Sequence, residues 1–444
     1  MKKRSIQHIG LLVNKRYTWS KTPRIKEVLD KTNAFLKAYY TPSLSIMTIA
    51  ALTPREIEIS YIDENFEDID YNKGYDIVGI TAMTQEALHA YNVAAEFRKR
   101  GVYVVMGGIH ASVMPEEAAR FVDTVIIGEA ERLWPQFLSD YESNCERKFY
   151  YSDDKVPVDL TMSPIPRYDL LHKKNYFMDP HLYYNMVPIQ TSRGCPHDCE
   201  FCLVTKIYGN RFRTKTMAQI ESEIIEIKKY FPGKILLFSD DNLFVNKKHS
   251  RELLTLLKRL NIRWWAQSDI GIGDDDELLT MAYESGCLTL LIGLESINPE
   301  NLKTMNKSSW KYRQLVNYGR NIDNIQKHGI IVFGSFIFGL DNDDKRVFKN
   351  VVTFMDEHNI TGQLTIATPL PGSRLFKRLH DEQRMLAQEP FWDRCTFLDV
   401  LFKPKNLTVE DLEEGFLWAY SQVFNKDSFD KRSNYLKTIY KNIH

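Results

Sequence analysis

The sequence predicts an α/β protein with three successive parts: a doubly wound, Rossmann-like domain, a partial TIM-type (β/α)6 barrel and a C-terminal helical region. Short and nearly continuous apolar runs alternate with amphipathic stretches over most of the chain. That alternation is typical of parallel sheets that helices cover on both faces. The alternation stops at a proline-containing stretch after Ser152 and restarts at Val187. After Pro371 the pattern is that of helices alone.

Five strands are expected in the first part, residues 1–150. The runs "DIVGIT", "VYVVMGG" and "DTVIIGE" are apolar throughout, as in strands buried on both faces. The candidate strands are His8–Asn14, Glu56–Asp63, Asp76–Ala82, Val102–Gly107 and Thr124–Gly128. Ligands of such sheets bind beyond the carboxyl ends of the strands. The residues expected at that edge are Thr81, Met83, Thr84, Gly107, Gly108, His110, Gly128 and Glu129.

A linker is expected over residues 151–184, where "KVPVDLTMSPIPRYDLL" has little periodicity. The strands expected after it are Val187–Ser192, Ile235–Asp240, Arg263–Asp269, Leu288–Glu295, Ile330–Phe338 and Gln363–Pro369. Amphipathic helices are expected between them, including Met217–Tyr230, Ser250–Leu260, Trp310–Lys327 and Asp344–His358. Right-handed crossovers would curl such units into an incomplete barrel over residues 185–375, followed by helices over 376–444.

Composition and charge exclude several classes of protein. The chain of 444 residues carries 58 Lys and Arg against 58 Asp and Glu, so nothing in its net charge favours nucleic acid as a partner. No apolar run is long enough to span a membrane. The start, "MKKRSIQHIGLLVNK", has too short an apolar segment for a signal peptide. We therefore expect a cytoplasmic protein with reduced thiols and no transmembrane segment.

Half of the cysteines gather in one short stretch, "TSRGCPHDCEFCLVT". The loop holds Cys195, Cys199 and Cys202, whereas Cys145, Cys287 and Cys395 are far away in the sequence. Thiolates suit zinc and iron–sulfur clusters, but a structural zinc site needs a fourth ligand. His197 lies in a cramped position between the first two cysteines. A cubane held by three thiolates would leave its fourth iron open to a small molecule, so the spacing favours a cluster.

The stretch "RGCPHDCEFC" resembles the cluster loop of the radical S-adenosylmethionine (SAM) enzymes. Their pattern is C-x-x-x-C-x-aromatic-C, and Phe201 fills the aromatic position. The resemblance implies a 4Fe–4S cluster on Cys195, Cys199 and Cys202, with SAM bound to the open iron. In that family one electron from the cluster cleaves SAM. The resulting 5′-deoxyadenosyl radical abstracts hydrogen from a substrate C–H bond.

The same resemblance implies SAM contacts at the other strand ends, the active face of such barrels. "FSDDN" stands where the family often has Gly-Gly-Glu, and a carboxylate there can accept hydrogen bonds from the ammonium group of SAM. Asp241 can equally be a helix N-cap. The expected SAM-binding residues are Phe201, Ser239, Asp240, Asp241, Gln267, Glu295, Ser296, Gly334 and Pro369. Arg211 and Arg213 can pair with the SAM carboxylate or form a solvated basic turn.

The first part resembles the cobalamin-binding domain that is fused to many radical SAM enzymes. The resemblance rests on "DIVGITAMT", "VVMGGIHASVMPEEA" and "DTVIIGEAERLWPQFL", and it continues through the barrel into the tail. It implies cobalamin at the strand-end residues from Thr81 to Glu129 named above. It departs at "DENFED", where Asn65 replaces the histidine that ligates cobalt in the motif D-x-H-x-x-G. We expect cobalamin to bind without a protein imidazole; a domain that no longer binds it is the alternative.

The expected function is that of a cobalamin-dependent radical SAM enzyme that transfers a methyl group from methylcobalamin to a substrate carbon. Ring closure, carbon–carbon bond formation or oxidation without methyl transfer is the alternative outcome. A non-enzymatic electron-transfer or sensor protein is the alternative class, and a transfer-RNA methylthiotransferase is disfavoured because cysteines for a second cluster are missing. The expected partners are a small-molecule substrate, lipid-like or a natural-product intermediate, and a one-electron donor such as flavodoxin or ferredoxin. No individual catalytic residue is predicted.

Overall fold

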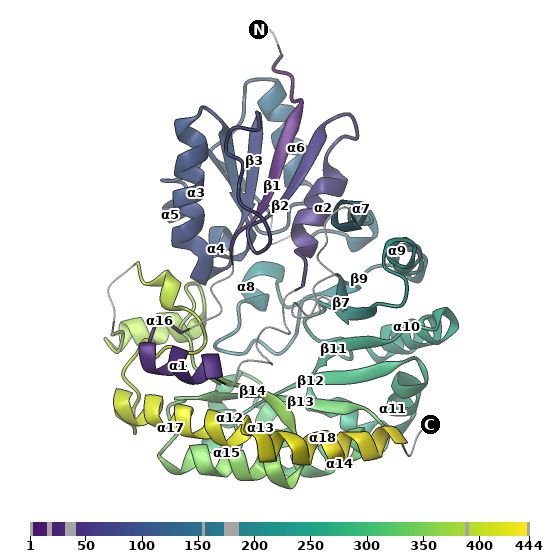
Figure 1. The fold of residues 1–444 in the computed structure, drawn as a ribbon, viewed down its shortest axis with the longest axis vertical. Helices are drawn as coiled ribbons and strands as arrows, with labels where there is room; N and C mark the ends of the chain where they lie inside the picture. Colours follow the sequence, from purple (N-terminus) through teal and green to yellow (C-terminus); the bar gives the residue numbers. More distant parts are fainter. Residues whose placement is uncertain are drawn as a thin grey trace.

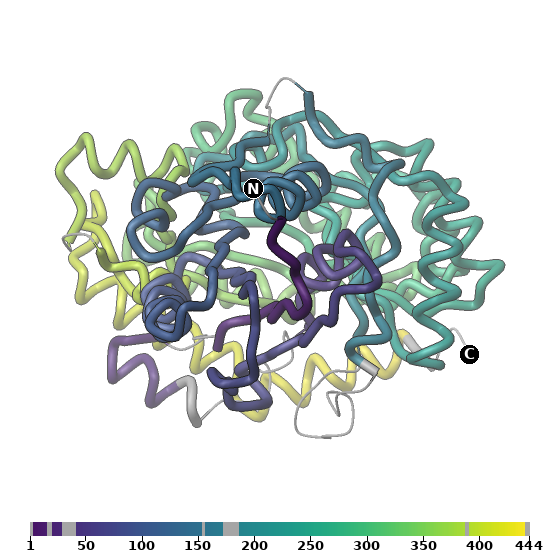
Figure 2. Tube along the Cα trace, turned by 90° about the horizontal axis from the view of Figure 1, so that it is seen from above, coloured from purple at the N-terminus to yellow at the C-terminus, as the bar shows by residue number. Residues whose placement is uncertain are grey.

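Two parallel sheets and a group of C-terminal helices make up the protein (Figure 1). The computed structural model describes residues 3–15, 20–31, 41–152, 156–172, 186–386 and 390–441. The first sheet lies at the top of Figure 1 and the second below it, and Figure 2 looks down on the first. The predicted α/β fold is therefore confirmed.

The first sheet has the strand order β2-β1-β3-β4-β5-β6, and all its neighbouring strands are parallel. The strands are β1 (His8–Val13), β2 (Glu58–Asp63), β3 (Ile77–Thr81), β4 (Tyr103–Gly107), β5 (Thr124–Ile127) and β6 (Phe149–Tyr151). The five predicted strands are confirmed, whereas the three-residue strand β6 was not predicted. The chain places β2 on one side of β1 and β3 on the other, so the order in which strands are added to the sheet reverses between β1 and β3. Ligands bind at the carboxyl ends of the strands at such a switch point.

Both faces of the first sheet are buried, as its continuous apolar runs require. Leu11 packs with Trp134 and Met47 on one face, and its neighbour Leu12 packs with Phe97 on the other. The covering helices are α2 (Leu44–Leu52), α3 (Ala87–Lys99), α4 (Gly108–Val113), α5 (Pro115–Ala118) and α6 (Leu133–Glu142). Figure 1 shows α3 and α2 on opposite sides of the strands.

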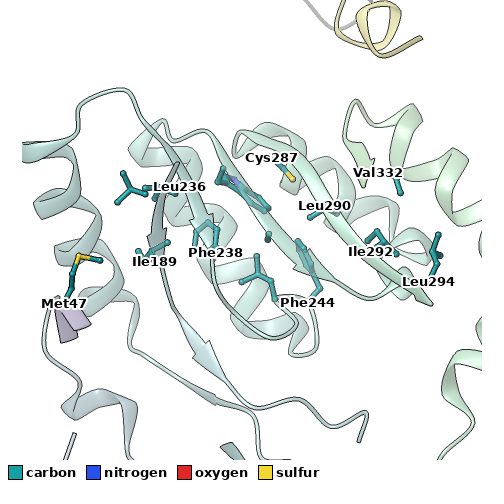
Figure 3. Packing of buried hydrophobic residues seen from close by; sticks show 14 of the residues in the cluster. Met47, Ile189, Leu236, Phe238, Phe244, Cys287, Leu290, Ile292, Leu294 and Val332 are labelled. Carbon is teal, nitrogen blue, oxygen red and sulfur yellow. The ribbon is translucent and has the colours of Figure 1, made fainter. Parts of the chain in front are cut away.

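The second sheet has the order β14-β13-β12-β11-β10-β7, so its strands follow one another in sequence, as in a barrel. They are β7 (Met186–Ile189), β10 (Ile235–Phe238), β11 (Trp264–Ser268), β12 (Cys287–Glu295), β13 (Ile331–Phe338) and β14 (Thr361–Ile366). Each overlaps its predicted range, although β14 ends at Ile366 instead of Pro369. Figure 3 shows Phe238, Leu290 and Ile292 among the buried side chains that these strands contribute to the core.

Helices cover the outside of the barrel. They are α9 (Met217–Tyr230), α10 (Lys247–Leu260), α11 (Asp276–Glu284), α12 (Pro299–Met305), α13 (Trp310–Gln314), α14 (Tyr318–Lys327) and α15 (Arg346–Glu357). The single helix predicted over Trp310–Lys327 is wrong, because a 3₁₀ turn at Leu315–Asn317 separates α13 from α14. Asn317 and Gly319 are poor helix formers and weaken the helix at this point.

Residues 20–31, from the N-terminal part of the chain, lie beside the C-terminal helices (Figure 1). These are α16 (Arg374–Asp381), α17 (Val409–Val423) and α18 (Lys426–Lys441). The helix α1 (Pro23–Lys31) lies against α17 instead of covering the first sheet (Figures 1 and 2). The segment before it is fixed by Asp399, which accepts hydrogen bonds from the Ser20 hydroxyl at 2.6 Å and the Thr22 hydroxyl at 2.8 Å.

The linker contributes the short helix α7 (Asp169–His172), and its residues 173–184 lie outside the described part of the chain. In the ranges that are described, no helix is long and apolar enough to cross a membrane.

Candidate functional site

The cysteine-containing loop is closed at its base by a small hairpin. β8 (Ser192–Arg193) pairs with β9 (Arg213–Thr214) in antiparallel register. Gly194 follows β8 with φ +94°, and a Cβ there would lie 2.2 Å from the carbonyl oxygen of Arg211. Only glycine fits this close approach in the left-handed region. The hairpin therefore brings both ends of the loop together directly before Cys195.

The three thiols of the loop are free and partly buried. Burial raises the pKa of Cys195 to about 11 and that of Cys202 to about 12, and it also raises the pKa of Cys199. Thiols in such a place stay protonated until a metal displaces the proton. By contrast, Cys287 and Cys395 lie in hydrophobic cores and Cys145 is exposed.

His197 does not provide a fourth metal ligand beside the three cysteines of the loop. Its Nε2 lies 3.1 Å from the Asp269 carboxylate, and its ring centroid lies 4.5 Å from that of Trp310. Among the residues whose placement is described, no three His, Cys, Asp or Glu side chains converge to hold one metal ion. A cubane does not require such convergence, because each thiolate binds a different iron. Three thiolates are the donor set of a cluster with one open iron, whereas a structural zinc ion needs a fourth ligand.

The two adjacent aspartates after β10 do different things. Asp240 is completely buried, and its carboxylate accepts hydrogen bonds from the Thr191 hydroxyl at 2.7 Å and the Ser192 hydroxyl at 2.5 Å. It fixes the strand that leads into the cysteine loop. Asp241 accepts the Gly194 N–H at 2.8 Å, and burial raises its pKa to about 6. Asp241 is not a helix N-cap, since Asn246 caps α10.

The end of β12 carries a buried ion pair. Glu295 has φ +65° at an irregularity in the pairing of β12 with β13. The Lys311 ammonium donates to its carboxylate at 3.0 Å and to the Gly293 carbonyl at 2.6 Å. Next to it, the Ser296 hydroxyl accepts the Asn298 N–H at 3.0 Å. Both predicted SAM contacts on β12 are thus already engaged by protein groups.

The remaining predicted SAM contacts differ in accessibility. Gln267 is exposed at the end of β11, whereas Pro369 is buried beyond β14. Gly334 lies inside the sheet, where a Cβ would be 2.9 Å from the Ile360 side chain. Phe201 packs on the apolar core below the loop. Apart from the excluded N-cap, the structure does not test these assignments, so they stay predictions.

The carboxyl edge of the first sheet gathers buried polar atoms that lack a partner. Asn14 Oδ1, Thr84 Oγ1 and His110 Nδ1 make no hydrogen bond to the residues that the structure describes. They follow β1, β3 and β4, so they lie at the switch point and beside it. A buried polar atom without a partner costs about 1–3 kcal/mol. This edge therefore suits a ligand that is rich in amide groups, as cobalamin is.

Other residues of the predicted cobalamin site are used internally. The Nε2 of His110 lies 2.8 Å from the Tyr91 hydroxyl, which donates to Glu117 at 2.9 Å. Asn65 donates to Asp63 at 2.7 Å and to the Asn14 carbonyl at 3.3 Å, so it links the turn after β2 to the end of β1. The Thr81 carbonyl accepts a hydrogen bond from Asn14, and the Gly128 N–H donates to Ser112. Gly107 and Gly108 lie at the β4–α4 junction.

A cavity of about 230 Å³ lies where the first sheet, the cysteine loop and the tail meet. Met83 and Thr84 reach it from the first sheet, and Ser239 and Asp241 reach it from the barrel. The structure thus brings together residues from both predicted sites. The sequence analysis did not predict the other lining residues, among them Gln190, Tyr208 of α8 (Val204–Tyr208), and Phe397.

Comparison with known proteins agrees with this geometry. The radical SAM superfamily model matches residues 189–355, and the B12 binding domain model matches residues 37–138. The bacteriochlorophyllide d C-8(2)-methyltransferase of Chlorobaculum tepidum is 33% identical over 87% of this chain and 86% of its own length. The C-12(1)-methyltransferase of the same organism is 30% identical over 88% of this chain and 84% of its own length.

The chain belongs to the cobalamin-dependent radical SAM methyltransferases. A solved structure of the radical SAM methyltransferase TsrM from Kitasatospora setae, with cobalamin and a [4Fe–4S] cluster, has the same fold. Its TM-score is 0.68 at 15% identity, over 94% of this chain and 89% of that one. The predicted cofactors, a 4Fe–4S cluster, SAM and cobalamin, are confirmed, and so is the predicted methyltransferase class. Radical SAM enzymes act on a small-molecule substrate and need an electron donor.

A buried ion-pair network joins the two cofactor-binding parts of this radical SAM methyltransferase. Arg193, directly before the cysteine loop, pairs with Glu129 at 2.8 Å and Glu131 at 2.6 Å. Arg213, at the other end of the loop, also pairs with Glu129 at 2.8 Å. The Arg213 guanidinium, interpreted as a partner of the SAM carboxylate, is thus engaged by Glu129 in this structure, and that interpretation stays a prediction. The Glu129 carboxylate likewise faces the loop.

Phe397 enters the cavity of this methyltransferase from the tail in a strained conformation. Its φ of +66° is a genuine outlier for a bulky residue. Its carbonyl accepts the Ile366 N–H at 2.8 Å, and the Thr396 hydroxyl before it donates to Asp399 at 2.6 Å. These contacts impose the conformation. Strain of this kind is concentrated at functional sites, and here it occurs at a residue that lines the cavity.

The strain at Phe397 predicts an order of stability between two variants. Phe397→Gly and Phe397→Ala remove the same ring, but only alanine keeps a Cβ in the left-handed region. We expect the glycine variant to be more stable than the alanine variant by about 1 kcal/mol, measured by denaturant unfolding. An alanine variant as stable as the glycine variant would show that the backbone at this position is not strained.

Proposed function

We propose that this enzyme methylates an unactivated carbon of a small molecule bound in the cavity between the two sheets. The cavity is the observation that carries the proposal. It is lined from the cobalamin-binding part by Met83, from the barrel by Asp241, and by Leu203, the residue directly after Cys202. A substrate there would be next to both predicted cofactor sites.

In this proposal Cys195, Cys199 and Cys202 hold the cluster. When bound, the three cofactors supply an electron, a hydrogen-abstracting radical and a methyl group. Asp241 accepts hydrogen bonds from the ammonium group of SAM, supported by its place at the cavity. The edge of the first sheet around Thr84 holds cobalamin. Asp240 and Arg193 act indirectly, by fixing the loop that carries the cysteines.

The substrate that we propose is mostly apolar. Ile109, Ile207 and Leu370 form much of the cavity wall, and Gln190 and Tyr208 add a few polar groups. Such a lining excludes water and orients an apolar ring system. The two Chlorobaculum relatives, which are named for a bacteriochlorophyllide, agree with this class. A lipid-like ring system is the second candidate that the lining supports.

We also propose the setting in which the enzyme works. A flavodoxin or ferredoxin supplies the electron, and the six free cysteines favour the cytoplasm, where thiols stay reduced.

The cobalamin-binding domain spans residues 1–150, the linker 151–184, the barrel 185–375 and the helical region 376–444. Residues 20–31 belong with the helical region, because they pack against it.

Three measurements on the anaerobically reconstituted protein test the proposed function. We expect it to bind about one hydroxocobalamin per chain and to release 5′-deoxyadenosine when SAM and a reductant are added. Cells fed methyl-deuterated methionine should make a product that contains the labelled methyl group only when they express the enzyme. Cobalamin binding and 5′-deoxyadenosine without any labelled product would favour a radical reaction other than methylation. Absence of 5′-deoxyadenosine would contradict the proposal.

A further inference from the structure

Asn306 lies directly across from Cys199, although more than a hundred residues separate them in the sequence. The two residues form an isolated antiparallel bridge, and the Glu200 N–H donates to the Met305 carbonyl at 2.9 Å. The segment after α12 therefore runs alongside the middle of the cysteine loop. This brings the Asn306 carboxamide next to the central thiol of the three.

The orientation of that carboxamide is fixed by its neighbours. Its oxygen, Oδ1, accepts the Trp310 N–H at 3.1 Å and the Ser308 hydroxyl at 3.3 Å. A backbone N–H can only donate, so the atom that faces it must be the oxygen. The NH₂ group, Nδ2, consequently points the other way. Exchanging the two ends would place two donors against each other.

The Nδ2 group of Asn306 is a buried donor that lacks a well-formed hydrogen bond. The residue is 3% exposed, and in the part of the chain that the structure describes Nδ2 makes no close hydrogen bond, although the Cys199 thiol lies within its reach. An unsatisfied buried donor is costly, so an acceptor is expected in the functional state. Asn306 is also one of two groups, with Lys311, that favour the ionised form of Cys199 against the effect of its burial, which raises its pKa.

We propose that Asn306 Nδ2 donates a hydrogen bond to the Cys199 sulfur, or to the cluster sulfide beside it, and thereby makes the cluster easier to reduce. This inference rests on the proposed assignment of the three cysteines. Reduction adds one electron, supplied by the external donor, and the added negative charge is spread over the sulfur atoms. A donor to sulfur stabilises that charge and raises the reduction potential. Asn306 is thus a positioning residue that acts through the cluster.

The test compares reduction of the cluster in the wild type and in two variants of the full chain. Asn306→Asp keeps the oxygen that Trp310 and Ser308 require but loses the donor, whereas Asn306→Ala loses the side chain. The fraction of reduced cluster is measured by its electron paramagnetic resonance signal in the absence of SAM. All three proteins are held at the solution potential at which half of the wild-type cluster is reduced. We expect the ratio of reduced to oxidised cluster to fall about fivefold in Asn306→Ala, the net effect of one hydrogen bond. In Asn306→Asp it should fall further, because a carboxylate repels the added electron.

Asn298→Asp is the matched control. It makes the same chemical change at the other end of α12, where Asn298 is the N-cap. We expect this control to stay within twofold of the wild type. A ratio that stays within twofold of the wild type in both Asn306 variants, with full iron content, would overturn the inference. If the proposed function itself were wrong, the result would differ. The wild type would then hold no cluster, or variants that lack the three cysteines would still hold one.

Discussion

Replacing any one of Cys195, Cys199 or Cys202 by alanine is expected to abolish the visible absorption of the iron–sulfur cluster and the release of 5′-deoxyadenosine. Each of three irons depends on one thiolate. His197, a possible alternative donor within the loop, is engaged with Asp269 at 3.1 Å. Iron content, the absorption spectrum and 5′-deoxyadenosine after reconstitution measure the effect, which should reach background.

The other three cysteines provide the matched controls. Cys145→Ala, Cys287→Ala and Cys395→Ala make the same chemical change at an exposed site and in two hydrophobic cores. We expect full cluster content in all three. A loss of the cluster in one of them would mean that the cluster has a fourth protein ligand. The argument that an open iron binds SAM would then fail.

Arg193→Met is expected to destabilise the protein by about 3–5 kcal/mol, the usual effect of removing one partner of a buried charge network. The Arg193 side chain is 11% exposed, and that of Glu131 is 6% exposed. Burial opposes ionisation of Glu131, but Arg193 and the Ser163 hydroxyl hold its pKa below its usual value. Without Arg193 this carboxylate is left buried and unpaired. Thermal and denaturant unfolding of the reconstituted protein measure the loss.

A double variant separates the charge effect from lost packing. In Arg193→Met with Glu131→Leu, no unpaired charge remains at that position, and we expect much of the lost stability to return. Arg259→Met is the surface control, since Arg259 pairs with Glu221 with its side chain 60% exposed. It should leave the unfolding midpoint unchanged. A double variant no more stable than Arg193→Met would show that the cost comes from packing instead.

Most of the fold could be predicted because buried parallel strands are apolar throughout. The runs around Val78, Val105 and Val125 are apolar on both faces, and each proved to be a strand. The short strand β6 lacks such a run, and its place depends on pairing with β5. The position of α1 could not be predicted either. An amphipathic helix shows only that one face is covered, and not that α17 covers it.

The candidate site was predictable where its chemistry lies within one short stretch. Cys195, Cys199 and Cys202 are identified by their spacing alone. The roles of Asp240 and Asp241 could not be separated, because what distinguishes them is the position of Thr191 and Gly194. Residues that reach the site from distant segments carry no local signal. Neither Asn306, which follows a helix, nor the aromatic residue Phe397 belongs to a recognisable sequence motif. Only the fold shows which groups each of them faces.

The contact between the start of the chain and Asp399 also fixes an order of events during synthesis. Ser20 and Asp399 are 379 positions apart, and both are needed for the 2.6 Å hydrogen bond between them. A ribosome adds about 5–20 residues per second, so Ser20 waits roughly 20 to 80 s for its partner. Every strand of both sheets has been translated by then. Residues 20–31 can therefore make this contact only after all the strands of both sheets are available to fold.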